Sequence, residues 1–265
     1  MKSLLRYPGG KTRALKHIVP YFPKNMTEMI SPFFGGGSIA LHYASQGVKV
    51  YGYDIFEPLT NFWQHAIPFG SRMATRIENN YHPCSKEQFK QMQERVANLK
   101  VDPFLRACFF YVINRSSFSG ATLSGGYSKQ AAEKRFTKSS IDRLRDFVCD
   151  DLIVQCASYE NSLRRHDDET FIYADPPYLL EKSTLYGERG STHKDFDHQR
   201  FAEEIKKKNN WVISYNPHPE ILELYKDYEI VYPNWTYGMS ADKKSKEILI
   251  LNVKENKDAL LTDDD

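Results

Sequence analysis

The stretch Phe171-Ile172-Tyr173-Ala174-Asp175-Pro176-Pro177-Tyr178 decides the fold of this chain of 265 residues. Its first four residues are apolar and rich in β-formers, which predicts a short buried strand. In an α/β sheet, ligands bind at the carboxyl ends of the strands. We therefore expect the tetrad Asp175 to Tyr178 to lie at the edge of a sheet where a binding site forms.

The tetrad accepts hydrogen bonds but offers few. Pro176 and Pro177 have no backbone N–H, and the ionised carboxylate of Asp175 is an acceptor only. Tyr178 adds a flat ring on which another planar ring can stack. The exocyclic amino group of a nucleobase fits this combination, and polarising that amine makes its nitrogen a better nucleophile. The alternative is an Asp-Pro turn that only closes a strand.

A glycine loop and an acidic residue earlier in the chain predict a nucleoside cofactor. Met29-Ile30 leads into Ser31-Pro32-Phe33-Phe34-Gly35-Gly36-Gly37-Ser38, and a helical run follows. Consecutive glycines let a backbone pass close against a ligand. The predicted strand 50–53 then ends in Asp54, where an acidic side chain is placed to accept from ribose hydroxyls. Near the N-terminus, Pro8-Gly9-Gly10-Lys11 is a tight turn whose lysine attracts a carboxylate or phosphate.

The order of predicted elements divides the chain into a catalytic domain and an insertion. In residues 86–100 and 102–113 the apolar side chains recur at helical spacing, where the alternation of strands and helices would place a strand. This alternation resumes with a predicted strand from Leu152 to Cys156. Further strands are predicted at 211–215, 228–232 and 247–253, with helices at 197–208 and 217–226. We predict a catalytic domain at 1–69 and 149–256, an inserted target-recognition domain at 70–148, and a disordered acidic tail at 257–265. A polar loop is expected from Glu181 to Lys194.

Positive charge concentrates in the predicted insertion. Between Arg106 and Arg145 there are eight basic and two acidic residues, a local +6 in a chain of net charge +2. Such a concentration is the electrostatic footprint of a protein that binds a phosphate backbone. Residues 114–120 and 124–129 are polar, glycine-rich and dotted with aromatics, which suits a hairpin or loop entering a DNA groove; a solvated mobile loop is the alternative. The candidate DNA contacts are Asn114, Arg115, Ser116, Ser117, Tyr127, Lys129, Lys134, Arg135 and Lys138.

Several classes of protein are disfavoured by the sequence. Cys84, Cys108, Cys149 and Cys156 are scattered and the histidines do not cluster, so neither a metal site nor a disulfide framework is predicted. Pro83-Cys84 is typical of the nucleophile of cytosine ring-carbon methyltransferases, but Ser85 to Gln88 reads as the capping box of a helix. No apolar run approaches the roughly 20 residues of a membrane helix, and no secretory signal is evident. We expect a soluble, intracellular protein.

These motifs, in this order, resemble the Dam-like DNA adenine-N6 methyltransferases that use S-adenosylmethionine. The resemblance covers about residues 5 to 253, and a cofactor loop before the tetrad with a basic insertion between them is the arrangement of the family's α group. It implies a Rossmann-like α/β fold with a mostly helical inserted DNA-recognition domain. It is carried by Pro8 to Lys11, Pro32 to Ser38, Asp54, Asn114-Arg115, Ser158-Tyr159-Glu160-Asn161-Ser162, Asp175 to Tyr178 and Ser214-Tyr215-Asn216.

The resemblance also implies roles, partners and products. Asp175 and the Pro176 carbonyl would accept from the amino group of an adenine flipped out of double-stranded DNA, with Pro177 and Tyr178 completing the catalytic tetrad. S-adenosylmethionine would be the cofactor and S-adenosylhomocysteine its product; no metal is needed. A monomeric or weakly dimeric state is expected, and a cognate restriction endonuclease is a candidate partner. The implied cofactor residues are Tyr7, Gly10, Lys11, Phe34, Gly35, Gly36, Gly37, Ser38, Asp54, Ile55, Tyr159 and Asp175.

Three other functions remain open at this point. A cytosine-N4 methyltransferase presents an amine to the same acceptors, although such enzymes more often resemble a Ser-Pro-Pro-Tyr form. A nicotinamide oxidoreductase also uses a glycine loop and an acidic ribose ligand, but the basic insertion and the acceptor-only tetrad argue against it. A DNA-binding relative that lost turnover is the third, and the intact tetrad argues against that.

Overall fold

The computed structural model describes residues 1–179, 196–233 and 247–253. The predicted polar loop from Glu181 to Lys194 and the predicted acidic tail at 257–265 lie outside these residues.

The described residues form a seven-stranded sheet in the order β3-β2-β1-β4-β5-β7-β6. Strands β1 to β5 run parallel, and β7 runs antiparallel to both of its neighbours, β5 and β6. The chain order reverses between β1 and β4, and such a switch point opens a crevice at the carboxyl ends of the strands. The strands are β1 (Glu28–Ser31), β2 (Lys49–Asp54), β3 (Leu152–Cys156), β4 (Phe171–Ala174), β5 (Trp211–Tyr215), β6 (Glu229–Val231) and β7 (Ile248–Asn252).

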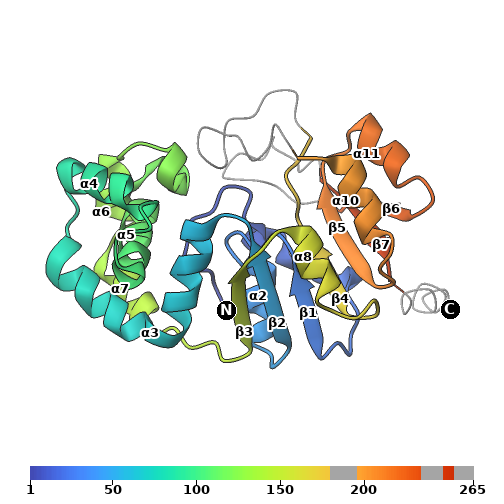
Figure 1. Cartoon of the computed structure of the whole chain (residues 1–265), viewed down its shortest axis with the longest axis horizontal. Helices are drawn as coiled ribbons and strands as arrows, with labels where there is room; N and C mark the ends of the chain where they lie inside the picture. The colour runs from blue at the N-terminus through green and yellow to red at the C-terminus, as the bar shows by residue number, and fades with distance from the viewer. Residues whose placement is uncertain (180–195, 234–246, 254–265) are drawn as a thin grey trace.

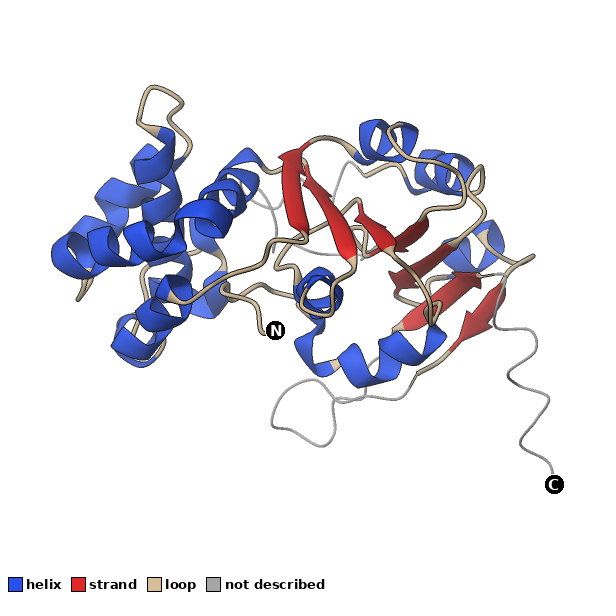
Figure 2. Cartoon of the chain, turned by 90° about the horizontal axis from the view of Figure 1, so that it is seen from below, coloured by secondary structure: helices blue, strands red, loops and turns tan. Residues whose placement is uncertain are grey.

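Helices cover both faces of the sheet, because successive strand residues point to opposite sides. In β4, Phe171 and Tyr173 join one core and Ile172 and Ala174 join the other. The first core is covered by α1 (Leu15–Ile18), α2 (Ser38–Ala44) and α3 (Glu57–Tyr81), and the second by α8 (Tyr159–Arg164), α10 (His198–Ile205) and α11 (Pro219–Leu224). Figure 2 shows helices on either side of the strands. The predicted Rossmann-like α/β fold is confirmed.

A group of helices extends from one end of the sheet (Figure 1). It contains the second half of α3, α4 (Lys86–Val96), α5 (Pro103–Ser116), α6 (Lys129–Lys134) and α7 (Lys138–Arg145), and we call residues 70–148 the helical lobe. Helix α3 runs from the sheet into the lobe, continuing to Tyr81 past Pro68, with a non-helical backbone at Phe69 (φ −130°, ψ 23°). Proline removes a helical hydrogen bond and kinks a helix without necessarily ending it.

The helix starts in the lobe follow the predicted capping signals. Ser85 and Gln88 form the capping box of α4, and Asp102 caps α5 with Pro103 at its first position. Thr137 caps α7 and forms a capping box with Ser140. Short 3-10 turns complete the described elements: η1 (Lys11–Arg13), η2 (Val19–Tyr21), η3 (Phe118–Gly120) and η4 (Thr122–Ser124).

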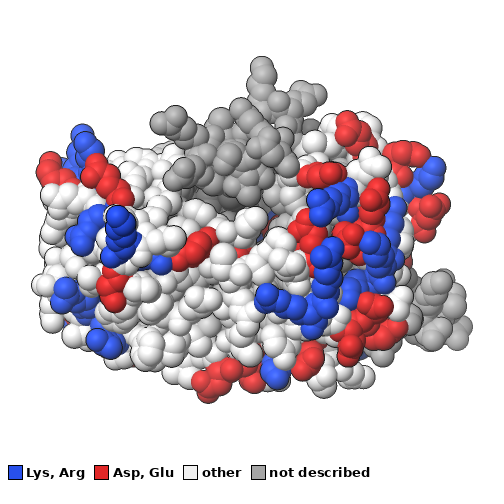
Figure 3. Space-filling view, viewed as in Figure 1, with Lys and Arg blue, Asp and Glu red and all other residues white. Residues whose placement is uncertain are grey.

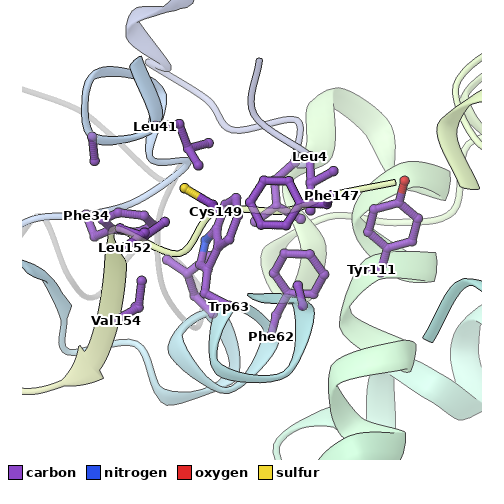
Figure 4. Packing of buried hydrophobic residues seen from close by; sticks show 14 of the residues in the cluster. Leu4, Phe34, Leu41, Phe62, Trp63, Tyr111, Phe147, Cys149, Leu152 and Val154 are labelled. Atoms are coloured by element: carbon purple, nitrogen blue, oxygen red, sulfur yellow. The ribbon is translucent and has the colours of Figure 1, made fainter. Parts of the chain in front are cut away.

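The helical lobe shares one hydrophobic core with the sheet. The rings of Phe34 and Trp63 lie 5.4 Å apart at 86°, and those of Phe62 and Tyr111 lie 5.8 Å apart at 13°. Figure 4 shows these side chains joining the sheet side of the core to α5 of the lobe. Phe62 and Trp63 are therefore core residues, and they tie the lobe to the glycine loop by direct packing.

Candidate active site

A cavity of about 730 Å³ opens at the carboxyl ends of β1, β2, β3 and β4. Its volume is typical of a small-molecule site. All of the predicted catalytic and cofactor residues line it, including residues as far apart in sequence as Tyr7 and Tyr178. The full predicted set is Tyr7, Gly10, Lys11, Phe34, Gly35, Gly36, Gly37, Ser38, Asp54, Ile55, Tyr159, Asp175, Pro176, Pro177 and Tyr178.

Neighbouring side chains leave no room for a Cβ at two positions of the glycine loop. A Cβ on Gly36 would lie 2.7 Å from Cβ of Tyr7, and one on Gly37 would lie 2.6 Å from Cζ of Phe34. Gly37 also has a positive φ of 68°, which side chains disfavour. Tyr7 and Phe34 thus approach this loop closely and hold it against the cavity, while close approach of a ligand stays a prediction.

Asp54 fixes the same loop from the end of β2. Its Oδ2 accepts from the Gly35 N–H at 2.9 Å, and its Oδ1 accepts from the Phe56 N–H at 3.0 Å. Burial raises the pKa of Asp54, while the backbone hydrogen bonds lower it in part. A carboxylate has about four lone-pair sites, so Asp54 keeps acceptor capacity for a hydroxyl. Ile55 beside it is 65% exposed and lines the cavity.

The tetrad is organised around the buried ammonium of Lys11. Nζ of Lys11 lies 2.9 Å from Oδ1 of Asp175 and donates to the Tyr178 hydroxyl at 2.8 Å. The same hydroxyl donates to Oδ1 of Asp175 at 3.0 Å. In this structure the donors that the tetrad requires are therefore supplied by the chain. Lys11 touches the tetrad, and its predicted place near the methionine carboxylate stays a prediction.

Several cavity residues were not predicted. Glu247, directly before β7, has Oε1 3.4 Å from Nζ of Lys11. Phe33 and Phe196 each have ring centroids 5.7 Å from that of Tyr159, and they form an aromatic wall. Arg200 of α10 lies 3.5 Å from a carboxylate oxygen of Glu160. Phe33 lies in the predicted loop, but Phe196, Arg200 and Glu247 carry no motif and reach the site only through the fold.

Four candidate DNA contacts are buried, so the prediction of an exposed polar segment is wrong for them. Asn114, Arg115 and Ser116 form the last turn of α5, which was predicted to end at about Ile113, and Ser117 follows directly. Their exposed fractions are 0%, 7%, 0% and 0%. The side chain of Arg115 donates to the carbonyl oxygen of Arg135. Polar residues that cap a helix and bind neighbouring loops are indistinguishable in sequence from residues of an exposed loop.

Asn114 connects the helical lobe to the N-terminal segment. Its Oδ1 accepts from the Arg6 N–H at 2.9 Å, and its Nδ2 donates to the Arg6 carbonyl at 2.8 Å and to the Gly120 carbonyl at 3.1 Å. The Arg6 guanidinium donates to the Ser117 carbonyl at 3.1 Å. Arg6 directly precedes Tyr7, which packs on the glycine loop. The end of α5 therefore holds the segment that supplies Tyr7 and Lys11 to the cavity.

The predicted basic patch is smaller than the count of charges indicated. Arg106 is buried and pairs with Glu57 at 2.6 Å, while Lys138 and Arg145 both pair with Glu78. Glu57 and Glu78 lie outside the counted window, and Arg115 is buried, so the local +6 does not appear as one surface. In Figure 3 the visible face of the lobe carries side chains of both signs. The remaining candidates, Tyr127, Lys129, Lys134, Arg135 and Lys138, are half-buried or exposed.

Cys84 has the surroundings of a core residue. It is 5% exposed, and burial raises the pKa of its thiol to about 11. A thiol needs to be ionised to act as a nucleophile. The thiol of Cys84 is thus protonated at neutral pH, in agreement with its interpretation as a core residue.

The sequence model of the D12 class N6 adenine-specific DNA methyltransferases matches residues 7–239. The chain belongs to this family. Its members transfer a methyl group to N6 of adenine in DNA, and this chain is a D12 class DNA methyltransferase that uses S-adenosylmethionine. The resemblance to adenine-N6 DNA methyltransferases that the motifs indicated is confirmed.

Curated relatives agree with this assignment. The type II methyltransferase M1.LlaDCHI of Lactococcus lactis subsp. cremoris is 24% identical over 95% of this chain and 95% of its own length. The DNA adenine methylase of Escherichia coli K12 is 27% identical over 69% of this chain and 67% of its own. The type II methyltransferase M.CviBI of Paramecium bursaria Chlorella virus NC1A is 24% identical over 67% of this chain and 69% of its own.

The cavity of this D12 class methyltransferase suits S-adenosylmethionine, which supplies an electrophilic methyl group when bound. Asp54 and Glu160 offer acceptors for ribose hydroxyls, the wall around Tyr159 offers apolar surface for a purine, and Lys11 offers a cation for a carboxylate. Across residues 1–179, 196–233 and 247–253, no helix is long and apolar enough to cross a membrane.

Proposed function

We propose that this D12 class methyltransferase modifies adenine at a specific site in double-stranded DNA, with Asp175 and the Pro176 carbonyl accepting from the amino group of a flipped-out base. The observation that carries the proposal is a single cavity that unites the tetrad, the glycine loop and Asp54. The amino group then faces the region where the cofactor binds. Fixed acceptors in a cavity that excludes water stabilise charge on the attacking nitrogen at little reorganisation cost.

Each member of the tetrad has a distinct task in this proposal. Asp175, at the end of β4, accepts one amino hydrogen, and the carbonyl of Pro176 accepts the other. Pro177 keeps the backbone free of a competing N–H and fixes the direction of the chain. Tyr178 presents its ring to the base, while its hydroxyl bonds to Lys11 and Asp175. The geometry thereby orients the nucleophile without a covalent enzyme intermediate.

The remaining cavity residues would hold the cofactor. Asp54 would accept from its ribose hydroxyls, and Ile55 and Tyr159 would border its adenine. The glycine loop, kept in shape by Tyr7 and Phe34, would pass beneath it. Lys11 and Ser38 would face its methionine portion. Lys11 pairs with Asp175 and lines the same cavity as the glycine loop, which supports a site in which base and cofactor lie end to end.

Residues 70–148 would form the target-recognition domain. The candidates that remain from the sequence prediction are the half-buried Tyr127 and the exposed Lys129, Lys134, Arg135 and Lys138, and they would contact the DNA backbone. Phe118, 72% exposed on the turn that Asn114 and Arg6 hold in place, would face the duplex. Asn114, Arg115, Ser116 and Ser117 would support this surface from within.

The biological setting is part of the proposal. The chain would act inside the cell, as a monomer or weak dimer. The type II designation of two relatives supports a cognate restriction endonuclease.

The proposal is tested by identifying the methylated product. The protein is incubated with double-stranded DNA and methyl-labelled S-adenosylmethionine, and the DNA is digested to nucleosides for mass spectrometry. We expect label in N6-methyladenine. Label in N4-methylcytosine would favour the cytosine alternative, and binding without product would favour the inactive relative.

A further inference from the structure

Glu247 is a carboxylate buried beside the tetrad, and the sequence motifs do not include it. It lies directly before β7, is 8% exposed, and lines the same cavity as Asp175. Its Oε1 is 3.4 Å from Nζ of Lys11, a residue 236 positions away in the chain. A buried carboxylate is costly unless it is paired. The Lys11 ammonium, itself 4% exposed, is the cation that this position brings to Glu247.

Lys11 has more acceptors around it than it has protons. Its ammonium carries three N–H donors. Among the described residues, four acceptors surround it: the Gly9 carbonyl at 3.3 Å, Asp175 Oδ1 at 2.9 Å, the Tyr178 hydroxyl at 2.8 Å and Glu247 Oε1 at 3.4 Å. Asp175 and Glu247 therefore compete for one cation, and the position of the ammonium depends on the charge of both.

This competition affects the oxygen that the reaction requires. Oδ1 of Asp175 already accepts from Lys11 and from Tyr178. Asp175 keeps lone pairs for an incoming amino group, but an ammonium held at 2.9 Å offsets the negative charge that would polarise that group. A second carboxylate on the other side of Lys11 offers the ammonium an alternative place, which lowers the cost of loosening its contact with Asp175.

We propose that Glu247 is a positioning residue that draws the Lys11 ammonium toward itself and so frees Asp175 to accept from the target amino group. The inference rests on the proposed role of Asp175. In this role Glu247 acts through its contact with Lys11 and does not touch the base. Without its charge, Lys11 has one carboxylate left in this cluster and stays on Asp175.

A purely structural role for Glu247 makes a different prediction. The main chain of β7 is held by pairing with β5 and β6, from Ile248 to Asn252, whatever side chain precedes it. Glu247→Gln keeps the shape and one acceptor oxygen and removes only the charge. Glu247→Asp keeps the charge on a shorter side chain. A structural role makes these two variants similar, whereas the proposal separates them.

The test measures single-turnover methyl transfer at saturating DNA and cofactor, together with cofactor affinity and thermal stability. We expect Glu247→Gln to slow methyl transfer by about tenfold or more, as loss of one preorganised electrostatic group does, with cofactor affinity changed by less than about threefold. Glu247→Asp should recover most of the rate. In a Lys11→Met background, Glu247→Gln should have little further effect, because interacting residues are not additive.

Three results would overturn the inference: a normal rate for Glu247→Gln, equal losses for the Gln and Asp variants, or an undiminished effect in the Lys11→Met background. If Glu247→Gln does not fold, the Asp variant and its Lys11→Met combination still decide. Asp175→Ala, measured in parallel, separates a failure of the proposed function from a failure of the proposed role of Glu247. If Asp175→Ala is active, the proposed function itself is contradicted. If Asp175→Ala is inactive and Glu247→Gln is fully active, only the proposed role of Glu247 is contradicted.

Discussion

Asp54 fixes the glycine loop and also lines the cavity, so one side chain can serve both the scaffold and a ligand. It accepts from the Gly35 and Phe56 N–H groups, which fixes the glycine loop at the end of β2. The same carboxylate faces the cavity. In the proposed function this arrangement is preorganised, because the loop beside Asp54 is shaped before any ligand arrives.

We expect Asp54→Ala to weaken binding of S-adenosylmethionine by about 1.5–3 kcal/mol, the range for a hydrogen bond to a charged group. Calorimetry measures this loss directly. Asp150→Ala removes an exposed carboxylate before β3 and serves as a charge-matched control that should bind normally. Equal affinity for the Asp54→Ala variant and the natural protein would place the ribose site elsewhere.

Helix α5 determines what the Asn-Arg motif can do. Because the helix continues to Ser116, Asn114 and Arg115 point into the lobe instead of toward solvent. Arg115 donates through Nε and Nη2 to the carbonyl of Arg135, just after α6. Burial lowers the pKa of Arg115 to about 10, which leaves it charged at neutral pH. A buried cation bound to a main-chain carbonyl joins α5 to the end of α6.

Arg115→Ala should lower the free energy of unfolding by about 1–3 kcal/mol, since it removes the hydrogen bonds from a charged, buried guanidinium to the Arg135 carbonyl. Arg135→Ala keeps that carbonyl and removes only an exposed side chain, so its effect should stay within about 0.5 kcal/mol. Urea denaturation of both variants measures the difference. If Arg115→Ala is as stable as the natural protein yet loses preference for its DNA site, Arg115 reads DNA, as the sequence interpretation had it.

The sequence predicted the elements and the cavity better than it predicted the lobe surface. Strand β4, the glycine loop and Asp54 are local signals, and parallel strands bring their carboxyl ends together whatever the details of packing. The prediction that Asn114 and Arg115 lie on the surface was wrong, because burial depends on where a helix ends relative to its neighbours. Glu247 gave no signal, since its contact with Lys11 exists only once β7 is placed beside β5.

On the scale of the whole molecule, the helical lobe and the sheet are one packed unit. The aromatic pairs Phe34–Trp63 and Phe62–Tyr111 and the bonds of Asn114 to Arg6 join the lobe to the glycine loop (Figure 4). DNA bound on the lobe would thus rest on the same scaffold that shapes the cofactor site. The charges of the lobe are partly neutralised, so its affinity for DNA depends on fewer cations than the sequence count indicated.

Lys134 and Lys138 differ in a way that a salt series can detect. Lys138 pairs with Glu78 at 3.3 Å, whereas Lys134 forms no ion pair with another described residue. Lys134→Ala should make the slope of log DNA affinity against log salt concentration less steep by about 0.9. Lys138→Ala should change this slope by less. Lys207→Ala, after α10 and outside the lobe, should leave the slope unchanged. Equal slopes for all three variants would move the DNA surface away from the lobe.

The most direct test of the central claim compares methyl transfer and cofactor binding in Asp175→Ala. The carboxylate is the acceptor that polarises the amino group, whereas Lys11 keeps Glu247 as a carboxylate neighbour after the change. We predict that methyl transfer to adenine is abolished while the variant stays folded and binds S-adenosylmethionine with largely preserved affinity. Near-normal turnover of Asp175→Ala would contradict the account.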